Sequence, residues 1–145
     1  MATVYLAGAI DKVPADYAKG WRQEAAEKLL NLGFDVCDPT RGKDLDHSEA
    51  NTTLYEPKDI VETDLQAIAK SDILLVEMAR DDRPYVGTSM EIRQAYIWGL
   101  FIVVWGSPTS YWVRYHADAI VEDMDEAIEV TRKAWEGVSA WPNTS

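Results

Sequence analysis

The chain alternates short apolar runs with longer amphipathic or polar stretches. Five apolar runs stand out, at residues 4–7, 34–37, 73–76, 101–105 and 119–121, the last of them weak. The middle runs are apolar at nearly every position, which is typical of strands that are covered on both faces. Strands of this kind that alternate with helices build a parallel sheet wrapped by helices, so the pattern predicts an α/β fold.

Four amphipathic segments predict the helices that connect these strands. They span residues 15–32, 58–70, 88–98 and 124–135. The apolar stripe of the first helix contains Tyr17, Trp21, Ala25, Leu29 and Leu32. Gly33, Gly99 and Gly137 are predicted helix stops, because glycine readily adopts the left-handed conformation of a helix cap. The polar stretch 38–57 is about as long as an ordered loop becomes in a compact domain, which favours a lid or a binding loop.

Composition and charge narrow the kind of protein and its partners. With 145 residues, 47% of them hydrophobic, the chain fits one cored domain, residues 1–145. A net charge of −11 without any cluster of Lys or Arg argues against a nucleic-acid partner, because a phosphate backbone requires concentrated positive charge. No apolar run is long enough to cross a bilayer, and we expect a cytoplasmic protein without a membrane partner. Cys37, the single cysteine, is predicted to be a small core residue.

A carboxylate interrupts the apolar stripe of the helix predicted at 58–70. Asp64 falls in the middle of this stripe, whose members are Ile60, Val61, Ala67 and Ile68. An unpaired buried carboxylate is costly, and ionisable groups with unusual burial cluster at functional sites. The alternative is an aspartate that caps a helix or pairs with a neighbouring loop.

A second carboxylate lies in the segment Gly87-Thr88-Ser89-Met90-Glu91, which follows the third strand. Thr88 as N-cap with Glu91 three positions later has the spacing of a capping box, which would make Glu91 a helix-start residue. Against this, Glu91 shares its helix face with Ala95 and Trp98. Because ligands bind at the carboxyl edge of an open parallel sheet, Glu91 and Asp64 would meet there, and a carboxylate pair suits glycosyl transfer.

The first strand ends in small residues and contains one polar ring. Gly8 would let the backbone approach a ligand closely. Tyr5 lies in an otherwise apolar strand, where a buried phenol normally finds a hydrogen-bond partner. Its other interpretation is an ordinary aromatic residue of a strand.

Two further sets of residues carry less weight. Asp44, Asp46 and His47 could suggest a metal, but three potential ligands in an acidic loop are more often solvated, and no metal is predicted. His116 is predicted to be a packed or surface residue and not a catalytic base.

Three segments together resemble the nucleoside 2-deoxyribosyltransferase family, which includes related deoxynucleoside 5′-monophosphate N-glycosidases. They are Tyr5-Leu6-Ala7-Gly8, then Asp64-Leu65 followed by residues 71–76, then Gly87 to Glu91 with Ala95 and Gly99 beyond. The resemblance spans most of the chain. It implies a flavodoxin-like three-layer sandwich with a five-stranded parallel sheet.

The resemblance also implies an activity, an enzyme of nucleotide salvage that exchanges the nucleobase of 2′-deoxynucleosides. Glu91 would be the nucleophile that forms a covalent deoxyribosyl intermediate, Tyr5 would orient its carboxylate, and Asp64 would pass a proton to or from the base. The partners would be deoxynucleosides and free nucleobases, and no metal or organic cofactor would be required. The chain would act as a homo-oligomer (dimer, tetramer or hexamer) with sites completed across a subunit interface.

Substrate contacts are expected around these three residues. The expected residues are Gly8, Ala9, Asp11, Tyr85, Gly87, Ser89 and Met90. The family's transferases often have an acidic residue where this chain has Tyr85, which leaves the base preference open. Ser89 replaces a glycine of many relatives, and its hydroxyl is expected at the sugar site.

The phosphate site of the family's monophosphate hydrolases is not matched. They carry Ser and Arg where this chain has Ala9 and Asp11. A negative Asp11 would repel a 5′-phosphate, which favours free nucleosides. Lys12, Arg41 or Arg114 from another loop or subunit could compensate.

Two other functions stay open. A deoxynucleoside or deoxynucleotide N-hydrolase would use the same site, with water in place of the incoming base. A non-catalytic flavodoxin-like binding module is the second alternative, although residues 8–12 lack the Ser/Thr-rich phosphate loop of flavodoxins.

Overall fold

Five strands form one parallel sheet in the computed structural model, which describes residues 2–10, 13–41, 56–80, 85–108 and 110–138. The strands are β1 (Thr3–Ala7), β2 (Asp35–Cys37), β3 (Ile73–Met78), β4 (Phe101–Gly106) and β5 (Ala119–Val121). Their order is β2-β1-β3-β4-β5, and every neighbouring pair is parallel. The chain therefore reverses its direction of travel across the sheet between β1 and β3. This arrangement confirms the predicted α/β fold and its flavodoxin-like five-stranded sheet.

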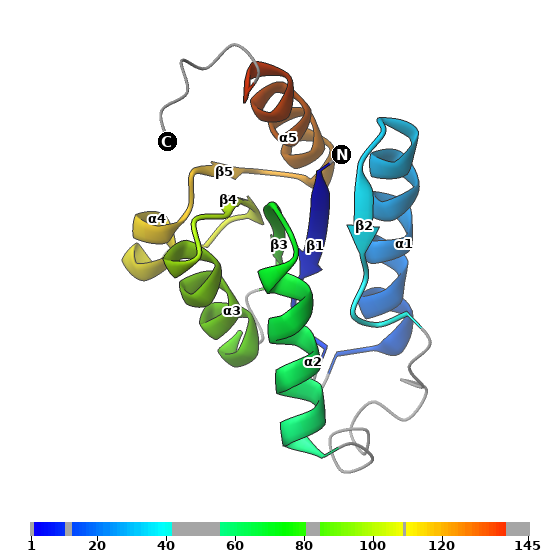
Figure 1. Cartoon of the computed structure of the whole chain (residues 1–145), viewed down its shortest axis with the longest axis vertical. Helices are drawn as coiled ribbons and strands as arrows, with labels where there is room; N and C mark the ends of the chain where they lie inside the picture. Colours follow the sequence, from blue (N-terminus) through cyan, green and yellow to red (C-terminus); the bar gives the residue numbers. More distant parts are fainter. Residues whose placement is uncertain (1, 11–12, 42–55, 81–84, 109, 139–145) are drawn as a thin grey trace.

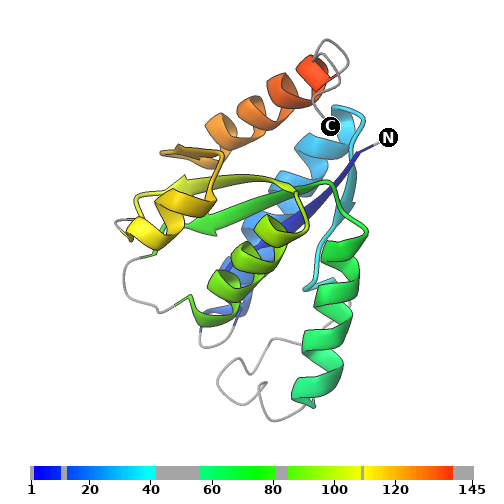
Figure 2. The same cartoon turned by 60° about the vertical axis from the view of Figure 1, so that its left-hand side comes forward.

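Helices cover both faces of the sheet. They are α1 (Ala15–Asn31), α2 (Pro57–Ala69), α3 (Val86–Ile97), α4 (Tyr111–His116) and α5 (Met124–Val138). Side chains of α1 and α5 belong to the apolar cluster on one face, whereas those of α2, α3 and α4 belong to the cluster on the other (Figure 1). Figure 2 shows α3 and α5 on opposite sides of the sheet. None of the helices in the described ranges is long and apolar enough to span a bilayer.

The central strand β3 explains the uninterrupted apolar pattern of its sequence. All six of its residues are buried. Ile73 and Leu75 point into the cluster beneath α1 and α5, and Leu74 and Val76 point into the cluster beneath α2 and α3. Both faces of this strand are thus apolar, as expected for a parallel strand between two helical layers. The strand also continues two residues beyond the predicted run, so Glu77 lies inside it.

The predicted start of one helix at Thr88 is wrong, and one helix was not predicted. Helix α3 begins at Val86, with Tyr85 as its N-cap and no side-chain cap, so the capping box of Thr88 and Glu91 does not form. Glu91 lies in the second turn, where it cannot act as a helix-start residue. Helix α4 was not predicted, because it has a single cap signal: Ser110 accepts a hydrogen bond from the Trp112 backbone N–H at 3.2 Å.

Predictions about helix ends are partly confirmed. Gly33 and Gly99 follow α1 and α3 with φ angles of 95° and 79°, as expected of glycine stops. Gly137 is not a stop, since α5 continues to Val138. A single glycine costs a helix only about 1 kcal/mol, which the packing of the rest of α5 can offset. Leu32 and Trp98, predicted to face the core, are about half exposed because they lie at the C-caps.

Gly106 provides a test of how tightly β3 and β4 meet at their carboxyl ends. Its φ is +121°, and a Cβ there would lie 2.3 Å from the backbone oxygen of Met78. Gly99 has φ +79° but nothing within 4 Å of such a Cβ. We expect Gly99→Ala to cost about 1–2 kcal/mol for the left-handed backbone alone. Gly106→Ala should cost about 1–3 kcal/mol more, because it adds a steric clash. Urea unfolding measures both, and equal losses for the two variants would contradict the clash.

Candidate active site

A pocket of about 630 Å³ lies at the carboxyl edge of the sheet, where the strand order reverses between β1 and β3. Residues from the end of β1, from α2 and from α3 line it. A switch point of this kind is where open parallel sheets bind ligands, because the loops on its two sides diverge. The polar side chains that face this space therefore decide what the site can do.

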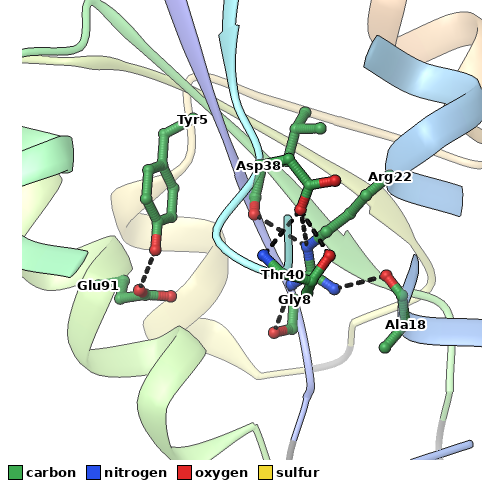
Figure 3. Close-up of polar contacts among 8 residues, drawn as sticks. Tyr5, Gly8, Ala18, Arg22, Asp38, Thr40 and Glu91 are labelled. Atoms are coloured by element: carbon green, nitrogen blue, oxygen red, sulfur yellow. Dashed lines mark hydrogen bonds and ion pairs between the residues drawn. The ribbon is translucent and has the colours of Figure 1, made fainter. Parts of the chain in front are cut away.

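Tyr5 and Glu91 are joined by a hydrogen bond inside this pocket. The Tyr5 hydroxyl donates to Oε2 of Glu91 at 2.9 Å (Figure 3). Tyr5 is only 1% exposed, and it reaches Glu91 from β1 across the packed face of the sheet. Burial, followed by the negative charges of Glu91 and Asp64, raises the pKa of Tyr5 well above its usual range. The phenol therefore keeps its proton and remains a donor to the carboxylate.

Asp64 completes the group from helix α2. Its side chain is half-buried and lines the same pocket as Tyr5 and Glu91. Its negative charge contributes to the raised pKa of Tyr5. The fully buried Ile68, one helical turn further along α2, anchors this helix against the sheet. Two carboxylates and one phenol from three separate elements thus converge on one space.

Most of the other predicted site residues surround the same pocket. Gly8, Ala9, Tyr85, Gly87 and Met90 all line it. Ser89 does not: it lines a second hollow of about 750 Å³. Asp11, Lys12, Asp44, Asp46 and His47 lie outside the described residues, as does most of the predicted lid, residues 42–55.

The second hollow lies on the other side of α3, between this helix and α4. His116 lines it, is 6% exposed and is therefore packed, as the sequence predicts. Its Nδ1 lies 2.7 Å from the backbone oxygen of Trp112. Its Nε2 lies 3.2 Å from Nη1 of Arg93. Both ring nitrogens are thus engaged, and the ring does not line the pocket that contains Glu91.

Gly8 has a structural requirement besides its place at the pocket. A Cβ on this residue would lie 2.9 Å from Cζ2 of Trp21 and 3.2 Å from Oε1 of Glu77. Both neighbours belong to the layer beneath α1, on the side of the strand away from Tyr5. The absent side chain therefore lets α1 pack directly against the end of β1.

Arg22 is a site residue that the sequence analysis did not identify. It is fully buried on α1 and lines the pocket. Its guanidinium donates to three backbone oxygens: Nε to Leu6 at 3.2 Å, Nη1 to Ala18 at 2.8 Å and Nη2 to Gly8 at 2.9 Å (Figure 3). The fork of donors thereby fixes the turn that leaves β1 and forms one wall of the pocket.

The charge of Arg22 is balanced from the end of β2. Oδ1 of Asp38 lies 4.0 Å from Nε and also accepts hydrogen bonds from the backbone and hydroxyl of Thr40. Burial lowers the pKa of Arg22, and Asp38 acts in the opposite direction. The sequence did hold a signal, because Arg22 sits among Ala18, Trp21 and Ala25 on the buried face of α1. An arginine within an apolar stripe needs buried partners.

Within the described ranges, no group of three His, Cys, Asp or Glu side chains is placed to hold a metal ion. The carboxylates beside the phenol donor can support nucleophilic attack, proton transfer and stabilisation of positive charge.

A family profile described as "Nucleoside 2-deoxyribosyltransferase like" matches residues 1–106. No curated protein is significantly similar to the chain in sequence.

Several solved structures share the fold at low sequence identity. A 2-deoxyribosyltransferase from the psychrotolerant bacterium Bacillus psychrosaccharolyticus has a TM-score of 0.63 at 21% identity, over 90% of this chain and 96% of that one. A 2-deoxyribosyltransferase from Leishmania mexicana has a TM-score of 0.68 at 14% identity, over 92% of this chain and 98% of that one. A CMP N-glycosidase from Clostridium botulinum has a TM-score of 0.55 at 17% identity, also over 92% and 98%.

The fold and the pocket define a flavodoxin-like α/β protein with two carboxylates gathered at the switch point of its sheet. The profile match covers residues 1–106 of 145, and the chain belongs to the nucleoside 2-deoxyribosyltransferase-like family. The resemblance found in the sequence is thereby confirmed.

Arg22→Lys tests whether the fork of donors, and not the positive charge alone, holds the pocket wall. A lysine keeps the charge but presents its donors at one point, so it cannot reach all three oxygens. We expect a loss of roughly 1–3 kcal/mol for each buried hydrogen bond to a carbonyl oxygen that is lost, measured by urea unfolding.

Arg132→Lys is the matched control, because Arg132 pairs with Glu129 and Glu136 on the surface of α5. It should change stability far less than Arg22→Lys. If Arg22→Lys were as stable as Arg132→Lys, the positive charge alone would be sufficient to hold the pocket wall.

Proposed function

We propose that the protein is a nucleoside 2-deoxyribosyltransferase that works through a covalent deoxyribosyl–Glu91 intermediate. The observation that carries the proposal is the 2.9 Å hydrogen bond from Tyr5 to Glu91 in a pocket that Asp64 also lines. The family membership supports the general activity, cleavage or exchange at an N-glycosidic bond. The assignment to Glu91 rests on the position of its carboxylate beside a protonated phenol.

In the proposed first step, a carboxylate oxygen of Glu91 attacks the anomeric carbon of the deoxyribose. The N-glycosidic bond breaks, and its electron pair leaves with the base. The transition state carries positive charge on the sugar, which the negative carboxylate of Glu91 stabilises. Tyr5 donates to Oε2 and thereby sets the orientation of the attacking group.

Asp64 is assigned the proton transfer. It would protonate a ring nitrogen of the departing base and later accept a proton from the incoming base. Its place on α2, opposite Glu91 on α3, allows the base to lie between the two helices. The second base then attacks the same carbon and releases Glu91, so the enzyme is regenerated.

The substrate is proposed to be a free nucleoside and not a 5′-monophosphate. Among the described residues, Arg22 is the arginine that lines the pocket, and it is fully buried and already donates to Leu6, Ala18 and Gly8. Arg41 and Arg114 are exposed and do not line the pocket. In the described part of the chain, the pocket therefore offers no uncommitted cation to a phosphate.

An exchange assay tests the transferase. The protein is supplied with deoxyadenosine, with and without free cytosine, and the products are separated by chromatography. We expect deoxycytidine only when cytosine is present, because the incoming base replaces water at the covalent intermediate. Free deoxyribose as the sole sugar product under both conditions would replace this proposal with a hydrolase.

Glu91→Gln tests the nucleophile. An amide cannot form the glycosyl ester, so we expect kcat/KM for exchange to fall by about 10³-fold or more. Circular dichroism and thermal unfolding should remain close to those of the unmodified protein, because the change is nearly isosteric.

Glu62→Gln is the matched control, since Glu62 is exposed on α2 and does not line the pocket. It should retain full exchange activity. If Glu91→Gln exchanged bases as fast as this control, the assignment of the nucleophile would be wrong. If the unmodified protein showed no turnover at all, the result would indicate a binding module.

A further inference from the structure

A buried carboxylate that the proposed mechanism does not use lies at the end of β3. Glu77 is 0% exposed, and its Oε2 accepts three hydrogen bonds: from the hydroxyls of Tyr17 and Tyr85 at 2.7 and 3.0 Å, and from the Ala79 backbone N–H at 2.9 Å. Its Oε1 is buried and has no hydrogen-bond partner among the described residues. A buried carboxylate oxygen without a hydrogen bond destabilises the fold unless the groups that Glu77 holds in place compensate for this cost.

One of the groups that Glu77 holds is part of the pocket. Tyr85 lines the pocket, yet its hydroxyl donates to Glu77 and also accepts from the Arg80 backbone N–H at 3.0 Å. Burial, together with the charge of Glu77, raises the pKa of Tyr85, so the hydroxyl keeps the proton that it donates. Glu77 itself does not line the pocket. The only O–H of Tyr85 is therefore committed outside the pocket, and the ring is what remains for a ligand.

Several other residues that line the pocket are apolar. Ile10, Leu65, Val86 and Met90 line the pocket together with Tyr85. Of the polar side chains assigned to chemistry, Tyr5 and Glu91 are joined by a hydrogen bond, and Asp64 lines the same pocket. An apolar wall that contains an aromatic ring suits the face of a planar ligand and offers it no directional contact.

We propose that Glu77 fixes Tyr85 as an aromatic wall that binds the nucleobase through its ring and makes no hydrogen bond to it. The identity of the ligand as a nucleobase rests on the proposed function. Glu77 is then a positioning residue, and Tyr85 contributes affinity for planar rings without discriminating among them. Base selectivity would have to come from other residues of the pocket.

The test compares three variants in a Glu91→Gln background, which prevents consumption of the ligand. Calorimetric titration gives Kd for deoxyadenosine, deoxycytidine and free adenine. Tyr85→Leu should raise Kd for all three by about fivefold to fiftyfold, since it removes the ring contact. Tyr85→Phe should raise all three by a common factor of about twofold to tenfold, because the ring loses its anchor.

Tyr17→Phe is the matched control. It removes another hydroxyl from the same oxygen of Glu77, but Tyr17 does not line the pocket. It should lower the melting temperature about as much as Tyr85→Phe and leave all Kd values unchanged. A purely structural role of the cluster predicts equal effects of these two variants on binding and would overturn the inference.

Three other results would also overturn it. The ratio of Kd values between the bases could change in Tyr85→Phe, or the Kd values could stay the same in Tyr85→Leu. The third such result is that the protein with Tyr85 unchanged binds none of the three ligands. The exchange assay judges the proposed function separately. Ring-dependent binding without turnover would overturn the activity alone, whereas turnover with binding indifferent to Tyr85 would overturn this inference alone.

Discussion

The carboxyl edge of the sheet depends on one buried guanidinium. Strand β1 ends where its backbone turns toward α1, and Arg22 supplies donors to the oxygens of Leu6 and Gly8 on one side of that turn and of Ala18 on the other. Burying a charge is costly, and Asp38 at 4.0 Å together with three aligned carbonyl dipoles offsets that cost. The same contacts join β1, α1 and the segment after β2. The pocket wall is therefore held by the interior of the protein, independently of any bound ligand.

The meeting of Tyr5 and Glu91 follows from ordinary core packing. Tyr5 lies in the same buried cluster as Leu74, Ile92 and Ala95. Ile92 and Ala95 press α3 onto the sheet, and Glu91 precedes Ile92 by one residue, so the apolar contacts set the distance between the carboxylate and the phenol. Preorganisation of this kind means that the polar pair need not be assembled when substrate arrives. The energetic basis of the site is thus hydrophobic, although its chemistry is polar.

Much of this arrangement was predictable from local pattern. The five apolar runs located every strand in the described part of the chain. Asp64 and Glu91 stood out because charged residues on buried helix faces often mark functional sites. Arg22 and Glu77 were not identified as site residues, for different reasons. Arg22 lies within an amphipathic helix, and Glu77 lies at the end of an apolar run whose length was underestimated by two residues. The start of α3 was misplaced because Thr88 offered a cap that the backbone does not use. The capping residues of a sequence indicate where a helix could begin, whereas the tertiary position of Tyr85 determines where α3 begins.

Helix α3 is a partition one helix thick between two cavities. Tyr85, Val86 and Met90 line both of them, whereas Glu91 and Gln94 face one, and Ser89 and Arg93 face the other. Because successive side chains turn by about 100° around a helix, neighbouring positions on α3 serve different spaces. The second hollow can consequently diverge between related proteins by substitutions at Ser89 and Arg93 that leave the pocket of Glu91 intact. Replacement of Tyr85, Val86 or Met90, in contrast, alters both cavities together. The evolution of the two cavities is therefore linked at these three positions.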